Sequence, residues 1–468
     1  MSDINSTKAI LEILQLNDEN HRFIPFPFKG TDSCIRKENH IMYINLRSEL
    51  GPIMCPHCGS VADHESKGTR SIELTHFSYG TMKVILVVNY HRFVCNDCHS
   101  YFVEDIPFRF NNMRITTPNA QSAIHEMTEN HSMASISRMH GLKPNTMYRL
   151  FDRNIEIAPR FYHLSPVISV DEFRGTTDKG FYAFNIIDPT TGKTLDIIED
   201  RKEAALVNYF SRFSYKEKAK VRIIVMDLSG AFRHIMHRMF PNAIIVADKF
   251  HYVKLARTNM TASRLETCAE MEDQALARSI KRNLHLFDKY RKNLDETRAW
   301  YDRNLRKHFT CKNYIEYVFE RDDTQAFHES YEIYQSLLKI IHEPCDDYKK
   351  GLNEWLDHIF DSGNSYYMAT AKNIRRNWFM PIYYSLDLKA TYTRKGKTYT
   401  TSYNNGCIES LNNVVKLVKR NAHGYRYFHN LRKRIFLHLG HAYRFIFSKH
   451  KKGRLFKFFR GLIFRGQL

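Results

Sequence analysis

The chain has 468 residues, enough for two to four domains, and its 70 lysines and arginines outnumber 50 acidic residues, giving a formal net charge of +20. Such an excess of positive charge favours a polyanionic partner, either nucleic acid or an anionic membrane surface. No stretch reaches the roughly 18 uninterrupted apolar residues of a membrane helix, and the acidic, polar N-terminus is unlike a secretory signal or transit peptide, so we expect no membrane association.

The cysteines predict a zinc site rather than a disulfide framework. There are nine, and five stand alone, which is typical of a reducing, cytosolic compartment. The other four form the pairs C-P-H-C and C-N-D-C, whose tight turns each offer two thiolates to one tetrahedral zinc ion: Cys55, Cys58, Cys95 and Cys98. His57 and His99 stand beside these pairs and are expected not to bind the metal. The alternative is four unrelated buried thiols.

The segment between the cysteine pairs predicts the fold of this module. Apolar residues alternate over 71–88, which indicates a strand or hairpin. We therefore expect a zinc ribbon over 41–110, preceded by an N-terminal helix and linker over 1–40.

Two short helices are expected next, in a segment over 111–160. A helix over 132–140, the turn G-L-K-P-N and a second helix over 146–152 form the helix-turn-helix pattern. In a DNA-binding motif of this kind the residues offered to the major groove would be Asn145, Thr146, Tyr148 and Arg149. The alternative is a plain helical hairpin.

Two apolar strands that run into aspartates follow, in a core segment over 161–255. The first leads to Asp171, and V-R-I-I-V-M leads to Asp227. Three strands with short turns predict an antiparallel meander, and a helical crossover would place the Asp227 strand parallel to the first. A further helix and a strand ending at Asp248 complete the order of a ribonuclease-H-like core. The alternative is that each aspartate only caps the next helix.

The remainder is expected to be mainly helical. Residues 256–400 predict a large all-helical insertion that ends in a basic hairpin or loop, and a segment over 401–440 contains the helix that carries Glu409. One face of that helix combines an acid, amides and cations, which suits a metal-bound phosphodiester: Glu409, Asn412, Asn413, Lys416 and Arg420. The alternative is a solvated helix face.

The last segment, 441–468, is a basic helical C-terminus in which cations alternate with aromatic residues. Such a surface binds phosphates and stacks bases. The alternative is an amphipathic helix with its aromatic side chains in a core, and both descriptions can hold together.

Asp171, Asp227 and Glu409 are the residue types used in two-metal phosphoryl transfer. Carboxylate oxygens bind Mg²⁺ (or Mn²⁺) while leaving coordination sites for water and substrate. Two ions roughly 3.5–4 Å apart would activate the attacking oxygen and stabilise the leaving one. Glu172 follows Asp171 in its strand and is expected to point to the opposite face. Asp248 also ends a strand, so the pattern alone leaves it open as the third ligand.

The ordered motifs resemble bacterial insertion-sequence transposases of the DDE type, and most of all the ISL-three family. They are C-P-H-C, C-N-D-C, V-D-E-F at 170–173, M-D-L-S-G-A at 226–231, A-D-K-F-H at 247–251, N-N-G-C-I-E-S-L-N-N at 404–413 and K-R-N-A-H-G-Y-R-Y-F at 419–428. Cys407 and Ser410 stand where proline and glycine are commoner. The resemblance implies a catalytic triad and supporting residues: Asp171, Asp227 and Glu409, supported by Asp248, Phe250 and His251.

The function that the resemblance implies is DNA transposition. The zinc ribbon and helix-turn-helix would bind terminal inverted repeats, with further DNA contacts on the Glu409 helix from Asn412, Asn413, Lys416, Lys419 and Arg420. The acids would cleave double-stranded DNA with Mg²⁺ and join the freed 3′-OH to target DNA. Pairing of two ends implies a homodimer or larger assembly, in the bacterial cytoplasm with the nucleoid. The alternatives are a non-catalytic DNA-binding regulator, and a ribonuclease-H-like nuclease without strand transfer.

Overall fold

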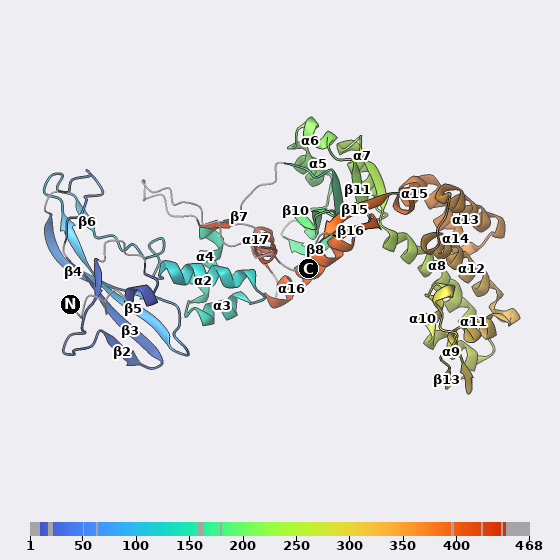
Figure 1. The fold of residues 1–468 in the computed structure, drawn as a ribbon, viewed down its shortest axis with the longest axis horizontal. Coiled ribbons are helices and arrows are strands. Elements are labelled where there is room, and N and C mark those ends of the chain that lie inside the picture. Colours follow the sequence, from blue (N-terminus) through green and yellow to red (C-terminus); the bar gives the residue numbers. More distant parts are fainter. Residues whose placement is uncertain are drawn as a thin grey trace. The chain divides into compact units, whose positions relative to one another are not determined.

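Two units divide the chain, Met1–Arg160 together with Val414–Leu468, and Phe161–Asn413 between them. The computed structural model, drawn in Figure 1, describes residues 10–16, 22–49, 51–61, 64–157, 163–177, 180–394, 397–422, 425–440 and 443–445. The second unit is thus an insertion into the sequence of the first.

The first unit begins with a six-stranded sheet. Its strands are β1 (Phe23–Pro25), β2 (Ile35–Glu38), β3 (Ile41–Ser48), β4 (Glu65–Thr75), β5 (Lys83–Val94) and β6 (Tyr101–Val103). β3 and β5 run parallel in the centre, and β4 pairs with β5 as the antiparallel hairpin expected between the cysteine pairs. Alternate residues of β5 point into a core with Leu46 and Leu74, which explains the apolar alternation in the sequence. The predicted first helix is described only in part, with residues 10–13 helical.

A helical module completes the first unit. It contains α2 (Thr117–His125), the 3₁₀ turn η1 (Glu126–Thr128), α3 (Met133–Met139), α4 (Pro144–Asn154) and α17 (Phe428–His438), and β7 (Ile155–Ile157) pairs with β17 (Tyr443–Phe445). The Ser132 hydroxyl accepts from the Ser135 amide (3.0 Å) and starts α3, and Pro144 starts α4. Gly141 between them has φ +61°, a left-handed conformation that glycine adopts without strain.

The basic helix α17 belongs to this module through both its apolar and its charged side chains. Leu437 is fully buried in the helical core. Lys433 donates to two backbone carbonyls of α4 (3.0 Å each), and Arg434 donates to two carbonyls of the loop before α3 (2.9 and 2.6 Å). The expected single segment over 401–440 is therefore divided. Its residues up to Asn413 belong to the second unit, and those from Val414 onward belong to the first. Of the expected basic helical C-terminus over 441–468, the structure describes only Tyr443–Phe445, which form the strand β17; the remainder of that segment lies outside the described residues.

The second unit contains a five-stranded mixed sheet and its helices. They are β8 (Val167–Thr177), β9 (Gly180–Asp188), β10 (Lys193–Ile198), α5 (Glu203–Ser211), α6 (Tyr215–Ala219), β11 (Ile223–Met226), α7 (Gly230–Met239) and β12 (Ile244–Ala247). The sheet order is β10-β9-β8-β11-β12, with the first three strands antiparallel and β8, β11 and β12 parallel, as expected. β8 does not end at Asp171, however, because it continues to Thr177 in its pairing with β9.

The remaining helices share one continuous hydrophobic core with this sheet. They are α8 (Lys249–Glu270), α9 (Gln274–Arg282), α10 (Leu284–Phe287), α11 (Cys311–Phe319), α12 (Gln325–His342), α13 (Tyr348–Ser362), α14 (Ser365–Asn373) and α15 (Phe379–Asp387), with 3₁₀ turns η2 (Arg291–Asn293) and η3 (Asp322–Thr324) and a π-helix, η4 (Ile374–Trp378). The hairpin β15 (Lys389–Arg394) and β16 (Lys397–Ser402) leads to α16 (Gly406–Asn421). No helix in the described part of the chain has the length and apolar character needed to cross a membrane.

The expectation of an all-helical insertion was wrong at one place. β13 (Trp300–Asp302) and β14 (Lys307–Phe309) form a small antiparallel hairpin. The rings of Trp300 and Phe309 lie 5.4 and 5.5 Å from the ring of Tyr314, so packing against α11 holds the two strands. Strands of three residues are too short to give a visible alternation in the sequence.

Candidate functional site

The first candidate site is a group of four cysteine sulfurs in the first unit. Cys55 Sγ lies 3.7 Å from Cys98 Sγ, and Cys58 Sγ lies 3.6 Å from Cys95 Sγ. All four lie within 4.8 Å of one another, and they are the only such group of His, Cys, Asp or Glu ligands among the described residues. Tetrahedral zinc with bonds of about 2.3 Å requires sulfurs about 3.8 Å apart, so the residues fit the ion. Ser100 donates to Cys98 and lowers the pKa of its thiol to about 6, which favours thiolate.

The two cysteine pairs have the same backbone turn. The Gly59 amide donates to the Cys55 carbonyl and the His99 amide donates to the Cys95 carbonyl, both at 2.9 Å. Gly59 has φ +78° and His99 has φ +55°, so the histidine occupies the left-handed position that glycine fills in the first pair. Neither His57 nor His99 belongs to the group of possible ligands.

The second candidate site lies at one edge of the sheet in the second unit. The parallel register pairs each residue of β11 with the β8 residue 56 positions earlier and the β12 residue 21 positions later (223 with 167 and with 244). Extending these offsets past the strand ends brings Asp227 level with Asp171 on one side and with Asp248 on the other. Three aspartates from neighbouring strands therefore form one row.

Helix capping does not account for Asp171 and Asp227. Asp171 lies inside β8, and Ser229 rather than Asp227 caps α7 by accepting from the Phe232 amide (3.4 Å). Within the described structure, Oδ1 of Asp227 is buried and has no hydrogen-bond partner. An oxygen in this position is suited to accept a cation.

Helix α16 is hydrogen-bonded to this row of aspartates. Asn412 Nδ2 donates to Asp171 Oδ2 (2.9 Å), and Asn412 Oδ1 accepts from Asn185 Nδ2 (2.8 Å). At the start of the helix the Asn405 amide donates to Asp248 Oδ1 (3.2 Å). Asn412, which the sequence placed among the DNA contacts, thus orients a carboxylate of the row.

Electrostatics indicate that the row is suited to a cation. Burial, and then the charge of Asp227, raise the pKa of Asp171 to about 6. Burial also raises the pKa of Asp227 and of Asp248, and the charge of Glu409 contributes to the rise at Asp248. His251 opposes the rise at all three aspartates, and its Nε2 lies 3.7 Å from Asp248 Oδ2. A divalent cation would stabilise the charged form of these carboxylates far more strongly than one half-buried imidazole.

Glu409 lies on the exposed face of the first turn of α16, three residues before Asn412. Its effect on Asp248 places it within electrostatic reach of the row. In the described structure the carboxylates do not form a ready group of metal ligands as the four sulfurs do.

Several neighbours of the row have other contacts. Glu172 accepts from the Arg201 guanidinium, which lies 4.1 Å from the ring centre of Tyr182, so Glu172 has its own partner. Phe250 is 61 % exposed on the first turn of α8. The sequence did not reveal Asn185, although the hairpin register that pairs it with Asp171 could have done so.

The predicted DNA-contacting residues of α4 lie mainly on its outer face. Asn145, Tyr148 and Arg149 are exposed and Thr146 is half-buried, whereas Met147 and Leu150 face the core. On α16 the described side chains of the other candidates are exposed or half-buried: Asn413, Lys416, Lys419 and Arg420.

The chain thus joins a zinc ribbon to an α/β unit with carboxylates at its sheet edge. Comparison of the sequence with known protein families identifies the class as transposase. A family model described as a transposase, of the ISL3 group, matches residues 168–435, and one described as the zinc-finger of transposases IS204/IS1001/IS1096/IS1165 matches residues 51–98. The chain therefore belongs to the ISL3 family of insertion-sequence transposases, which confirms the expected family and its zinc ribbon.

One individual relative agrees with this assignment. The chain is 23 % identical over 391 residues to the transposase for insertion sequence element IS1001 of Bordetella parapertussis, covering 82 % of this chain and 88 % of that protein. A segment of 41 residues is 51 % identical to an ATP-dependent protease of Lactococcus lactis subsp. lactis, covering 9 % of this chain and 13 % of that protein. The second match is too short to bear on activity.

Cys95→Ser is expected to abolish zinc binding, because a buried thiolate is replaced by a poor ligand and the site closes with four. Atomic absorption of the purified protein should show about one zinc per chain for the wild type and almost none for the variant. Cys34→Ser, at a half-buried cysteine outside the group, is the matched control and should retain the metal. Full zinc content in Cys95→Ser would contradict the site.

Asp171→Asn is expected to stabilise the metal-free protein more as the pH rises. Asp171 has a folded pKa of about 6 against an ordinary value of 3.8, so its protonated form stabilises the fold below 3.8 and this contribution is lost as the pH rises through 6. The gain of the variant in unfolding free energy should therefore grow by on the order of 1–3 kcal/mol between about pH 4 and about pH 8.

Urea unfolding in the presence of chelator measures this difference. Asp361→Asn, at an exposed acid on α13, should show no such dependence on pH. If the unfolding free energy of Asp171→Asn exceeded that of the wild type by the same amount at every pH, the pKa of Asp171 would not be raised.

Proposed function

We propose that this transposase binds the ends of an insertion sequence, cleaves DNA there with Mg²⁺ or Mn²⁺, and transfers the freed strand to target DNA. The observation that supports this most is the row of three aspartates at the sheet edge, two half-buried and one buried, with Asn412 of α16 bonded to Asp171. The strand order of the sheet supports a ribonuclease-H-like core.

The metal ligands in this proposal are Asp171, Asp227 and Glu409. Two bound ions would activate the attacking oxygen and stabilise the leaving oxygen. The protein itself orients the ligands, since Asn412 fixes one carboxylate oxygen of Asp171 and Asn185 fixes Asn412. Asp248 and His251 adjust the charge of the site.

The reaction has two steps in this proposal. In the first, water attacks phosphorus at the element end, the P–O3′ bond breaks, and a free 3′-OH remains. In the second, this 3′ oxygen attacks a target phosphorus, and its proton leaves as one P–O bond forms and another breaks. Both steps exchange one phosphorus–oxygen bond for another, so the same site can serve both.

DNA recognition would use the first unit. The zinc ribbon and the α3–α4 pair, as a helix-turn-helix, would bind double-stranded terminal inverted repeats, with Asn145, Thr146, Tyr148 and Arg149 facing the DNA. The exposed side of α4 and the net charge of +20 support this role. Because two element ends must meet, we propose a homodimer or larger assembly on DNA.

Asp227→Asn is expected to abolish cleavage and joining while leaving DNA binding intact, because it removes a metal ligand but no DNA contact. Removing this ligand is expected to cost several kcal/mol of transition-state stabilisation, so the cleavage rate should fall by about a thousandfold or more. The measurement is nicking and end-joining of duplexes that carry the element ends, with Mg²⁺, beside a binding titration of the same DNA.

A pair of variants decides which acid is the third ligand. Glu409→Gln should match Asp227→Asn, whereas Asp248→Asn should retain part of the activity. The reverse order would assign the role to Asp248. DNA binding without any chemistry in the zinc-loaded wild type would instead make the protein a regulator.

Asn412→Ala is expected to slow cleavage by roughly 10–100-fold without weakening DNA binding, as is typical when the partner of a metal ligand is removed. The hydrogen bond from Asn412 lowers the pKa of Asp171, so its removal should move the acid limb of the pH–rate profile to higher pH. Asn413→Ala on the same helix should weaken DNA binding and leave the profile unchanged. A profile that does not move in Asn412→Ala would show that Asn412 has no positioning role.

A further inference from the structure

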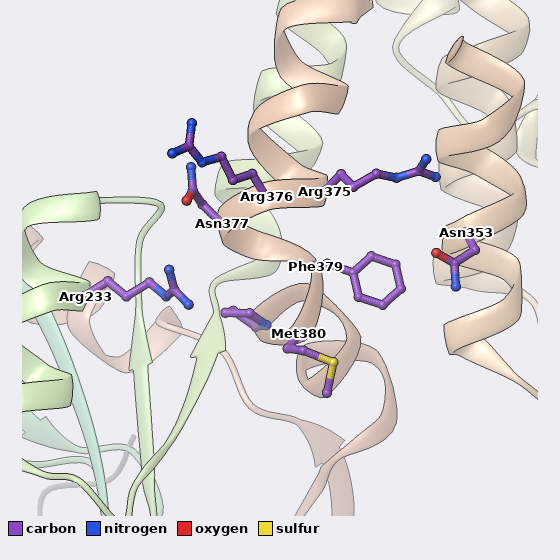
Figure 2. A pocket seen from close by; sticks show the side chains of 8 residues that line it. Arg233, Asn353, Arg375, Arg376, Asn377, Phe379 and Met380 are labelled. Atoms are coloured by element: carbon purple, nitrogen blue, oxygen red, sulfur yellow. The ribbon is translucent and has the colours of Figure 1, made fainter. Parts of the chain in front are cut away.

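A cavity of about 350 Å³ lies within the second unit and is lined mainly by basic and amide side chains. Its lining residues come from α7, α13, η4 and α15: Arg233, Asn353, Arg375, Arg376, Asn377, Phe379, Met380 and Pro381. In Figure 2 the Arg233 side chain extends from α7 toward η4, and Arg376 and Asn377 lie on the side of η4 that faces it. We call this cavity the arginine pocket.

The arginine pocket has a positive charge that its own lining does not balance. Three guanidinium groups line it and, within the described part of the chain, no carboxylate does. Arg375 is neutralised from outside the pocket by Asp357 (2.6 Å). The uncompensated charge therefore belongs to Arg233 and Arg376, and the latter is exposed.

Arg233 is held in place without having its donors satisfied. Its guanidinium carbon lies 5.6 Å from the ring centre of Trp378, a buried residue of η4, so the ring positions it but accepts no conventional hydrogen bond. Among the described residues, its Nε is buried and has no hydrogen-bond partner. A fixed guanidinium with a free donor is suited to bind an oxyanion.

The backbone of η4 contributes to the arrangement. Its five residues, Ile374–Trp378, form a π-helix, a rare local geometry that occurs frequently at functional sites. Ile374 and Trp378 are buried and anchor the turn, while Arg375 and Arg376 between them remain exposed. The π-helix thus holds Arg376 on the side of the pocket that faces Arg233.

The position of Arg233 relates the pocket to the acidic row. Arg233 lies on the first turn of α7, and α7 begins three residues after Asp227. A helix N-terminus adds a partial positive charge at this point. A DNA strand whose scissile phosphate lay at Asp227 would therefore pass Arg233 within a few nucleotides.

We propose that the arginine pocket binds a backbone phosphate of the DNA strand that is being cleaved, with Arg233 and Arg376 as the charged contacts. This inference rests on the proposed function, because it assumes that DNA reaches the acidic row. It adds a metal-independent phosphate contact to the site.

The test uses the full chain and a duplex that carries an element end. The double variant Arg233→Gln/Arg376→Gln should bind this DNA roughly tenfold more weakly, and the slope of log affinity against log salt should become shallower by about one for each phosphate that the variant no longer binds. Arg376→Gln alone, at an exposed position that does not threaten folding, should show part of both effects. Arg278→Gln, at an exposed arginine of α9 outside the pocket, is the matched control and should leave both unchanged.

Neutral methylphosphonate substitutions then locate the contact. A methylphosphonate at one position near the cleavage site should weaken DNA binding by the wild type. The same methylphosphonate should not further weaken binding by the double variant, because the DNA change and the protein change remove the same interaction. If the double variant behaves like Arg278→Gln, or if every methylphosphonate affects both proteins equally, the pocket does not bind DNA. Stabilisation of the wild type alone by inorganic phosphate, with unchanged DNA binding in the variant, would assign the pocket to a free anion and overturn the proposal.

Failure of the pocket and failure of the proposed function give different results. If the wild type neither binds nor cleaves the element-end duplex, the function is wrong. If the wild type does both and the double variant is unaffected, only the pocket assignment is wrong.

Discussion

The parallel register of β8, β11 and β12 is the constraint on which the rest of the second unit depends. It brings Asp171, Asp227 and Asp248 level at one edge, where burial and mutual repulsion raise the pKa of each carboxyl. A hydrophobic core alone would favour apolar residues there. The strands hold the acids together because the apolar residues before them, such as Val225 and Met226, are fully buried. The sheet thus stabilises an unfavourable cluster of like charges.

Helix α16 connects this cluster with the other unit of the chain. Its first part, with Glu409 and Asn412, belongs to the second unit, and from Val414 onward the same helix belongs to the first. The sheet fixes the beginning of the helix through two hydrogen bonds to aspartates. In the proposed function, the element that carries the third carboxylate is thereby covalently continuous with the unit that would bind the DNA ends.

Local sequence patterns predicted the parts of this structure that local physics determines. The cysteine pairs, the apolar strands before Asp171 and Asp227, and the glycine turn at Gly141 are such signals, and the strand order follows from them. The family resemblance supplied Glu409, because a single exposed acid on a helix is not distinctive by itself.

Features that depend on contacts between distant residues were not predictable in this way. Asn412 reads as one of several polar residues on a helix face, and only its partner, 241 positions away in the sequence, shows its role. The short hairpin at Trp300 and Phe309 packs against Tyr314, and the π-helix η4 buries Ile374 and Trp378. In each case tertiary packing decides the local conformation. The secondary-structure propensities of the residues do not contain that information.

The charges of the second unit also explain why metal and arginine would be needed together in the proposed function. A row of carboxylates repels a DNA phosphate, so bound cations are required before a phosphodiester can approach Asp227. The arginine pocket, whose Arg233 lies on the first turn of α7 shortly after Asp227 in the sequence, presents the opposite charge without a metal. Phosphate binding at Arg233 would hold the strand near the acids whether or not the ions are present, and the ions would then determine whether the strand is cut. On this argument the grip on the strand being cut and the dependence on metal would reside in different residues of the second unit, apart from the recognition of the DNA ends by the first.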